Sequence, residues 1–121
     1  MASITKRTFE DPDETRRPDK TRMDIIDLGS AKAARMTAEP GWTWSTCIKP
    51  LAGTDSCQTR HVGVVQAGSL TVTHDDGTEV QLNPGDVYVI EPGHNARVTG
   101  DQVFTTLEFE SHTAEIYAKG S

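Results

Sequence analysis

Cys57 and His61 are the pair of residues in this sequence best suited to metal chemistry. They are four residues apart, so on a continuous β-strand both side chains would point to the same face. A thiolate and an imidazole suit Zn²⁺, whose catalytic sites combine three protein ligands with one open position. Two interpretations stay open: the pair belongs to a metal site, or His61 is a hydrogen-bonded residue and Cys57 a small buried hydrophobic side chain.

Aromatic side chains form a second group of candidate site residues. Trp42 and Trp44 alternate with Thr43 and Ser45, so on a strand both indoles would face one side. Such a pair either packs in a core or lines the wall of a ligand cavity. Tyr88 is interpreted in the same way, and the pattern therefore makes the three aromatic residues candidates for contact with a ligand.

The remaining ionisable residues are expected to be less important for a site. We expect mostly surface positions for three charged side chains and for two histidines, namely Glu91, Arg97, Glu108, His74 and His112, although any one of the three charged side chains could reach into the mouth of a barrel. The two cysteines, Cys47 and Cys57, are too few for a disulfide framework, and we expect both to be free thiols.

The elements that must position these residues are short and strand-like. From residue 23 onward, apolar segments end repeatedly at glycine or proline turns, and Asp75-Asp76-Gly77 is a strong hairpin signal. The expected strands cover residues 23–28, 33–38, 42–48, 61–66, 69–74, 79–82, 87–90, 96–99 and 102–109, with a short helix or strand at 114–117. This pattern predicts an all-β sandwich or barrel.

Residues 1–22 differ in composition from the rest of the chain. They hold six Lys or Arg and five Asp or Glu residues, and Phe9 is their main candidate for an apolar anchor. Such a segment buries too little apolar surface to offset its ordering entropy. We therefore expect an extended charged arm over residues 1–22 and one β-barrel domain over residues 23–119.

Charge and hydropathy exclude some classes of partner. The 121 residues carry a formal charge of −6 with a pI of about 5.1, which argues against binding to nucleic acid or to an anionic membrane surface. No apolar run approaches the roughly 20 residues that span a bilayer, and the N-terminus lacks the apolar stretch of a secretion signal. We therefore expect a cytoplasmic protein.

Two glycine-bounded motifs resemble the paired motifs of the cupin family. The first extends from Gly53 to Gly68, and the second contains Gly85-Asp86 and Pro92-Gly93. The resemblance covers about residues 31–110 and implies a single jelly-roll barrel of two antiparallel sheets. In cupins the two motifs form opposite walls of the barrel, and their side chains usually hold a divalent metal.

The ligand positions of the cupin motifs are only partly matched. His61 falls where the family places a glutamate, Cys57 where it places its second histidine, and Asp55 where it places its first. Ala96 occupies the usual position of the last histidine, while His94 directly follows the glycine of the second motif. The resemblance thus implies a metal site of Cys57, His61 and His94, with Asp55 as a candidate fourth ligand. Loss of the oxygen ligand favours zinc or nickel over iron or manganese.

A closer resemblance is to a subgroup of small, single-domain bacterial cupins of unsettled activity. Its motifs are matched in five separate segments, namely residues 40–45, 49–57, His61, 76–79 and 92–94. This resemblance implies a barrel and a pocket, and it implies no particular reaction.

The leading functional interpretation is a small-molecule-binding cupin with a sensor or accessory role. Its pocket would be lined by Trp42, Trp44 and Tyr88 beside the metal site. The alternative is a metal-dependent isomerase, lyase or dioxygenase that uses the same pocket, with Glu91 or Asp55 moving protons. A third class, a structural partner-binding module, also stays open.

Assembly is the last expectation that the resemblance supplies. Cupins commonly pair through their first strands, and residues 23–28 form an apolar candidate for such an edge. We therefore expect a homodimer in which the charged arm lies across the partner.

Overall fold

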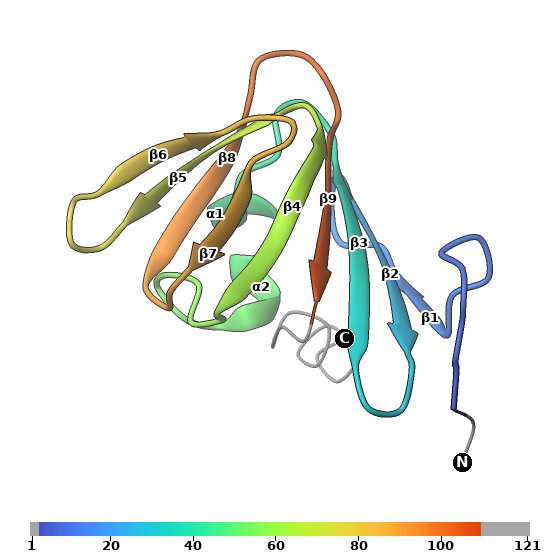
Figure 1. The fold of residues 1–121 in the computed structure, drawn as a ribbon. Coiled ribbons are helices and arrows are strands. Elements are labelled where there is room, and N and C mark those ends of the chain that lie inside the picture. Colours follow the sequence, from blue (N-terminus) through green and yellow to red (C-terminus); the bar gives the residue numbers. More distant parts are fainter. Residues whose placement is uncertain (1–2, 110–121) are drawn as a thin grey trace.

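The computed structural model describes residues 3–109, so His112 and the element expected at 114–117 lie outside the described part of the chain. Between residues 3 and 109 the chain forms nine strands and two short helices (Figure 1). In chain order these are β1 (Glu14–Arg16), β2 (Thr21–Asp27), β3 (Lys32–Ala38), α1 (Trp44–Cys47), α2 (Lys49–Ala52), β4 (His61–Ala67), β5 (Ser69–His74), β6 (Glu79–Leu82), β7 (Val87–Ile90), β8 (His94–Thr99) and β9 (Phe104–Phe109).

The strands form two sheets whose described neighbours all pair antiparallel. The larger sheet has the order β1-β2-β3-β9-β4-β7, and the smaller has the order β6-β5-β8. The two sheets face each other with the pocket between them, and α1 and α2 lie near the end where β4 and β8 begin (Figure 1). The predicted all-β fold of two antiparallel sheets is confirmed.

The core lies between the sheets because alternate residues of each strand point inward. On β9, Phe104, Thr106 and Glu108 are buried while the residues between them are partly exposed. Leu70 and Val72 of β5 contribute from the smaller sheet to the same apolar cluster as Phe104. Period two is thus the physical basis on which the strands β2 to β9 were predicted.

The segment from Trp42 to Ile48 was predicted as a strand, and this prediction is wrong. Residues 44–47 form helix α1 instead, since the Thr43 side chain caps it by accepting a hydrogen bond from the Thr46 N–H at 3.1 Å. Helix α2 follows directly, with Pro50 in its first turn and Gly53 closing it at φ 75°. Neither described helix is long and apolar enough to cross a membrane.

The expected arm is partly incorporated into the larger sheet. Glu14–Arg16 forms β1, which pairs with β2 of the same chain, so residues 23–28 are not at the edge of the sheet. The Arg35 guanidinium lies 5.2 Å from the centre of the Phe9 ring, which makes Phe9 an anchor of this segment. The division into an arm and a barrel domain stays a prediction, as does any contact of the arm with a partner.

Candidate metal centre and pocket

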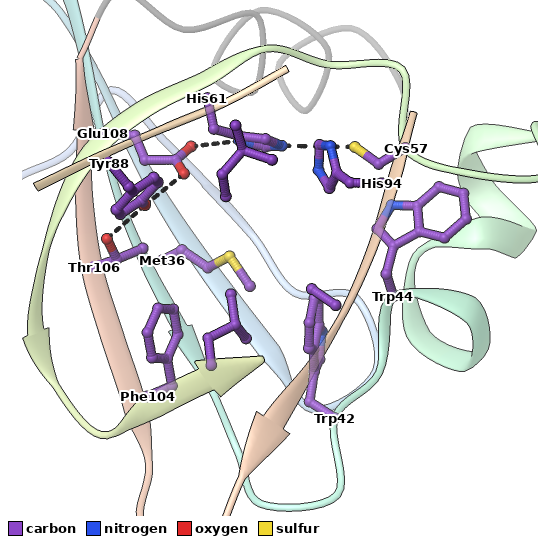
Figure 2. Close-up of a pocket in the computed structure, with 13 residues that line it drawn as sticks. Met36, Trp42, Trp44, Cys57, His61, Tyr88, His94, Phe104, Thr106 and Glu108 are labelled. Atoms are coloured by element: carbon purple, nitrogen blue, oxygen red, sulfur yellow. Dashed lines mark hydrogen bonds and ion pairs between the residues drawn. The ribbon is translucent and has the colours of Figure 1, made fainter. Parts of the chain in front are cut away.

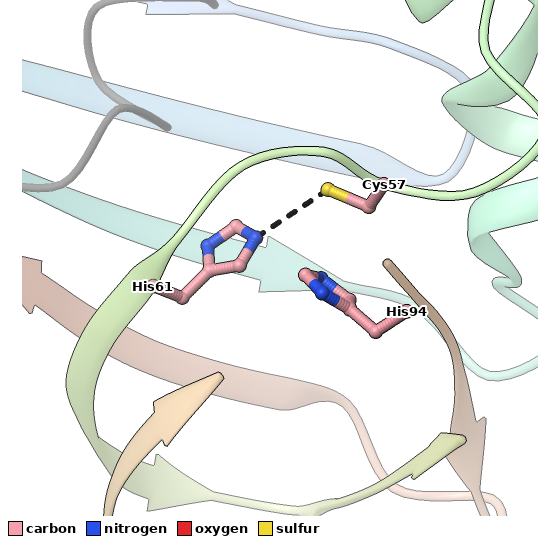
Figure 3. A group of neighbouring side chains, drawn as sticks. All are labelled: Cys57, His61 and His94. Carbon is pink, nitrogen blue, oxygen red and sulfur yellow. Dashed lines mark hydrogen bonds between the residues drawn. The ribbon is translucent and has the colours of Figure 1, made fainter. Parts of the chain in front are cut away.

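Three potential metal ligands converge at one end of the barrel, as Figure 3 shows. One donor atom from each of Cys57, His61 and His94 lies within 4.8 Å of the other two. The Cys57 Sγ is 3.6 Å from the His61 Nε2, and the two imidazole rings meet edge to face with centres 5.0 Å apart. His61 begins β4 of the larger sheet and His94 begins β8 of the smaller, so the site joins both walls.

Cys57 reaches the site through a backbone bridge rather than through a strand shared with His61. Its N–H donates to the His94 carbonyl at 2.7 Å, and its carbonyl accepts from the Gly93 N–H at 2.7 Å. Residues 58–60 have no regular secondary structure, and β4 starts only at His61. The prediction that Cys57 and His61 lie together is therefore met, but the reason given for it, a continuous strand, is wrong.

Each histidine is held by an acceptor at its Nδ1 atom. The His61 Nδ1 lies 2.9 Å from the Glu108 Oε1, and the His94 Nδ1 lies 2.8 Å from the Glu91 carbonyl oxygen. Because both partners accept hydrogen bonds, each Nδ1 carries the donated proton and Nε2 is the atom available to a metal. Metal-binding histidines are typically oriented in this way by a carboxylate or a backbone carbonyl.

Glu108 is the site residue that the sequence analysis missed. A surface position was the main expectation, with a reach into the barrel mouth as the alternative, and the side chain is in fact buried, with 5% of the residue exposed. Besides contacting His61, it accepts a hydrogen bond from the Tyr88 hydroxyl at 2.8 Å, and this hydroxyl also lies 2.7 Å from the Thr106 Oγ1 (Figure 2). One feature of the sequence could have indicated this position. Glu108 alternates with Phe104 and Thr106 along β9, so all three side chains are on the inner face of the strand.

A glycine makes room for this group of side chains. A Cβ added to Gly63 would lie 2.4 Å from the Leu107 carbonyl oxygen, 2.8 Å from the Tyr88 hydroxyl and 3.0 Å from the Glu108 Cγ. The first two separations are shorter than real Cβ contacts allow. The absence of a side chain at this inward position of β4 therefore lets Tyr88 and Glu108 approach each other.

Burial and mutual charge shift the ionisation of the site. Burial alone would raise the pKa of the Cys57 thiol, but hydrogen bonds with His61 and His94 outweigh it and lower this pKa to about 6. Burial would lower the pKa of His61, but the Glu108 charge and the hydrogen bond with Cys57 raise it to about 10. Without metal, the two residues therefore form an imidazolium–thiolate pair at neutral pH.

Glu108 also affects the ionisation of Tyr88. Burial raises the pKa of the Tyr88 hydroxyl, and the negative charge of Glu108 raises it further. The hydroxyl therefore keeps its proton and remains the hydrogen-bond donor to Glu108.

The three converging residues lie at one end of a cavity between the sheets. About 50 Å³ of this cavity can hold the centre of a water molecule. In Figure 2, Glu108, His61, His94 and Cys57 follow one another along the upper side, while Phe104 and Trp42 lie at the opposite end. The lining consists of Met36, Trp42, Trp44, Cys57, His61, Leu70, Tyr88, Ile90, His94, Ala96, Phe104, Thr106 and Glu108.

The three aromatic residues proposed from the sequence all line this cavity. Trp42 and Trp44 are buried beside it even though Trp44 belongs to a helix. The Trp42 Nε1 is buried and has no hydrogen-bond partner among the described residues. Core packing and cavity lining, which the sequence analysis weighed as alternatives, are therefore both true of these residues.

Two other sequence candidates lie outside the site. The Asp55 side chain is fully exposed and lies 3.8 Å from the Lys49 Nζ, so the structure does not place a fourth ligand there. The Glu91 side chain forms an exposed ion pair with Arg60 at 2.9 Å, and only its backbone carbonyl contacts the site through His94. Neither carboxylate is placed to move protons in the cavity, because both point to solvent.

Comparison with known proteins supports the fold. No protein-family model and no curated protein sequence matches the chain. A protein of unknown function from Rhizobium leguminosarum bv. viciae 3841 superposes with a TM-score of 0.64 at 19% identity, covering 89% of this chain and 96% of its own.

Two further similar structures carry names that refer to activities. A sugar phosphate isomerase of the cupin superfamily, from Silicibacter pomeroyi, superposes with a TM-score of 0.58 at 19% identity. The match covers 79% of this chain and 69% of the isomerase. The polyketide cyclase RemF from Streptomyces resistomycificus has a TM-score of 0.62 at 17% identity, with 89% and 79% covered. The chain therefore has the fold of the cupin superfamily, and at these identities the likeness extends to the fold alone.

Proposed function

We propose that this protein binds a divalent metal through Cys57, His61 and His94 and uses the adjoining cavity to bind a small molecule. The observation that carries the proposal is the orientation of both histidines, whose Nδ1 atoms are held by Glu108 and by a backbone carbonyl. One ring nitrogen of each histidine and the thiol sulfur lie within 4.8 Å of one another, and the His61 Nε2 is 3.6 Å from that sulfur. Three ligands and one open position are the arrangement of zinc sites that accept a further ligand.

The ligand set favours zinc, with nickel as the next choice. A thiolate and two imidazoles are softer than the carboxylate and histidine sets that suit iron or manganese. Among the described residues the one other acid of the cavity wall is Glu108, and it faces the His61 Nδ1 and the Tyr88 hydroxyl. Glu108 is therefore assigned to orienting His61 rather than to binding the metal.

The residues around the metal site favour a sensor or accessory role over catalysis. The acids first considered for proton transfer, Asp55 and Glu91, point to solvent. A metal with one open position at the end of a mostly apolar cavity is suited to holding a small molecule.

A metal-dependent enzyme is the second candidate. One specific observation favours it, namely that Tyr88 and Glu108 place a proton donor and a carboxylate beside His61. An isomerase and a cyclase among the structurally similar proteins are compatible with such chemistry on this fold. In this version the metal would polarise a substrate oxygen at the open position.

The proposal is tested by metal analysis of purified protein and of two histidine variants. We expect one equivalent of zinc or nickel in the wild-type protein and none in His61→Ala, with unchanged far-ultraviolet circular dichroism. His74→Ala is the matched control, because the His74 ring bonds to the Pro92 carbonyl outside the site. Failure of the wild-type protein to bind added zinc, or retention of metal by His61→Ala, would overturn the proposal.

The two versions of the function differ in their response to ligands. For a binding protein, thermal-shift screening of the zinc-loaded form against metabolites identifies a compound that binds and is recovered unchanged. For an enzyme, the same compound is converted, and conversion is lost in Tyr88→Phe while the metal is retained.

A further inference from the structure

We infer that the ligand of this cavity is a small uncharged molecule with one metal-binding atom and an apolar body, rather than a phosphate or a dicarboxylate. The inference rests on the proposed function, since it takes the metal as given. It follows from three features of the described lining, namely its charge, its hydrogen bonds and the distribution of its apolar side chains.

The charge of the lining disfavours a multiply charged anion. A divalent metal bound to the Cys57 thiolate and two neutral histidines has a net charge of +1. The buried Glu108 carboxylate adds a negative charge on the same side of the cavity. The described lining contains no lysine or arginine, the residues that normally hold phosphate and paired carboxylates. A dianion would therefore exchange its hydration for a site with little positive charge to offset the loss.

Apart from the buried Trp42 Nε1, the polar side chains of the wall already have hydrogen-bond partners in the protein. The Tyr88 hydroxyl donates to Glu108, and the Thr106 Oγ1 lies within hydrogen-bond distance of that hydroxyl and of the Val64 carbonyl. The His94 Nδ1 is bound to a backbone carbonyl. A ligand with many polar groups would have to break these bonds, whereas a ligand with one donor atom needs only the metal.

The other end of the cavity is apolar and small. Phe104 and Trp42 lie at this end (Figure 2), and Leu70, which is four residues along β5 from the cross-strand partner of His94, adds a third apolar side chain. About 50 Å³ of the cavity can hold the centre of a water molecule, so the space is small. The cavity therefore fits a compact apolar group that extends from the metal toward β5 and β9.

The test uses cobalt-substituted protein, because visible absorption of Co²⁺ reports a new ligand on the metal directly. Pyrazole and 4-methylpyrazole are the uncharged probes, and inorganic phosphate and oxalate are the anionic ones. We expect both pyrazoles to change the spectrum, and the methyl group to tighten binding about fourfold through its burial. Phosphate and oxalate should bind at least tenfold more weakly than pyrazole.

A pair of neighbouring variants localises the effect. Ile90 lines the cavity, whereas Val89 is on the opposite face of β7 and is 54% exposed. We expect Ile90→Ala to remove most of the advantage of the methyl group and Val89→Ala to leave it unchanged, with the cobalt spectrum of the ligand-free site preserved in both.

The possible failures are distinguishable. Tighter binding of phosphate or oxalate than of pyrazole, or no gain from the methyl group, would overturn the ligand class while the metal site stands. A protein that binds no cobalt would overturn the proposed function and, with it, this inference.

Discussion

Glu108 is the side chain on which the orientation of His61 depends. Its carboxylate lies 2.9 Å from the His61 Nδ1, while the His61 Nε2 faces Cys57. We expect Glu108→Gln to weaken zinc affinity by about 10- to 100-fold, because a weaker acceptor no longer fixes the ring and its basicity. Competition with a chromogenic chelator measures the change.

Glu79→Gln is the control for this substitution, because Glu79 is an exposed residue of β6 in the other sheet. It should leave zinc affinity unchanged. If Glu108→Gln bound zinc as tightly as the wild-type protein, the orienting role of Glu108 would be wrong.

Cys57 provides a prediction about pH in the metal-free protein. Its pKa is lowered from 9.0 to about 6, so the thiolate should form well below the pH at which a free thiol ionises. Absorbance at 240 nm, followed from pH 4.5 to 10 against Cys57→Ser as the blank, should rise with a midpoint near pH 6. A midpoint near 9 would contradict the imidazolium–thiolate pair.

The lowered pKa of Cys57 also makes the free energy of unfolding depend on pH. A thiol whose pKa is depressed on folding stabilises the native state fully above its unfolded value of 9.0, and this contribution is lost as pH falls through about 6. The difference in free energy of unfolding between wild-type protein and Cys57→Ser should therefore shrink between pH 9 and pH 6. Denaturant unfolding of the metal-free proteins measures it.

At the scale of elements, the meeting of β4, β7 and β9 depends on Gly63. A methyl group there would contact the Leu107 carbonyl and the Tyr88 hydroxyl too closely. We expect Gly63→Ala to lower the free energy of unfolding by about 1–3 kcal/mol, as overpacked core substitutions do. Gln66→Ala, on the exposed side of the same strand, should change it far less. Equal effects of the two substitutions, measured by denaturant unfolding, would contradict the proposed steric role.

The attachment of β1 to the larger sheet depends on a buried carboxylate. Asp24 of β2 is 1% exposed and accepts hydrogen bonds from Thr15 of β1, Arg22 and Arg35. Removing it leaves the Thr15 hydroxyl without its acceptor. It also takes one carboxylate from Arg22, which is half exposed, and from Arg35, which also pairs with Glu10. We therefore expect Asp24→Ala to cost about 1–3 kcal/mol of unfolding free energy. Asp101→Ala, at an exposed position between β8 and β9, is the matched control and should cost little. A cost for Asp24→Ala no larger than that of the control would show that the network contributes little.

At the scale of the whole molecule, the homodimer stays a prediction. Because β1 pairs with β2, residues 23–28 are not a free edge, and a partner strand could pair there only if β1 were displaced. Exposed apolar side chains on the outer face of the larger sheet, with Val87 at 79%, Val89 at 54% and Phe109 at 47% exposed, still favour self-association. Sedimentation velocity at micromolar concentration should show twice the 13.2 kDa mass of the chain. A single species of the monomer mass would contradict the prediction.

The sequence by itself determined where most strands lie and which side chains could bind a metal. Period-two segments bounded by glycine turns predicted β4 to β9 closely, because side-chain alternation and turn geometry are local properties. The residue types Cys57, His61 and His94, together with the cupin resemblance, identified the donor atoms that the structure brings within 4.8 Å.

The tertiary structure alone decided which alternating side chains meet across the barrel. Glu108 alternates as any strand residue does, and only the pairing of β9 with β4 places it against His61. Trp42 to Ile48 also alternates, yet the Thr43 cap gives a helix there. Cys57 lies outside any regular element and is positioned by a bridge to His94. Periodicity specifies two faces of a strand, but contacts between distant segments depend on the packing of the whole chain.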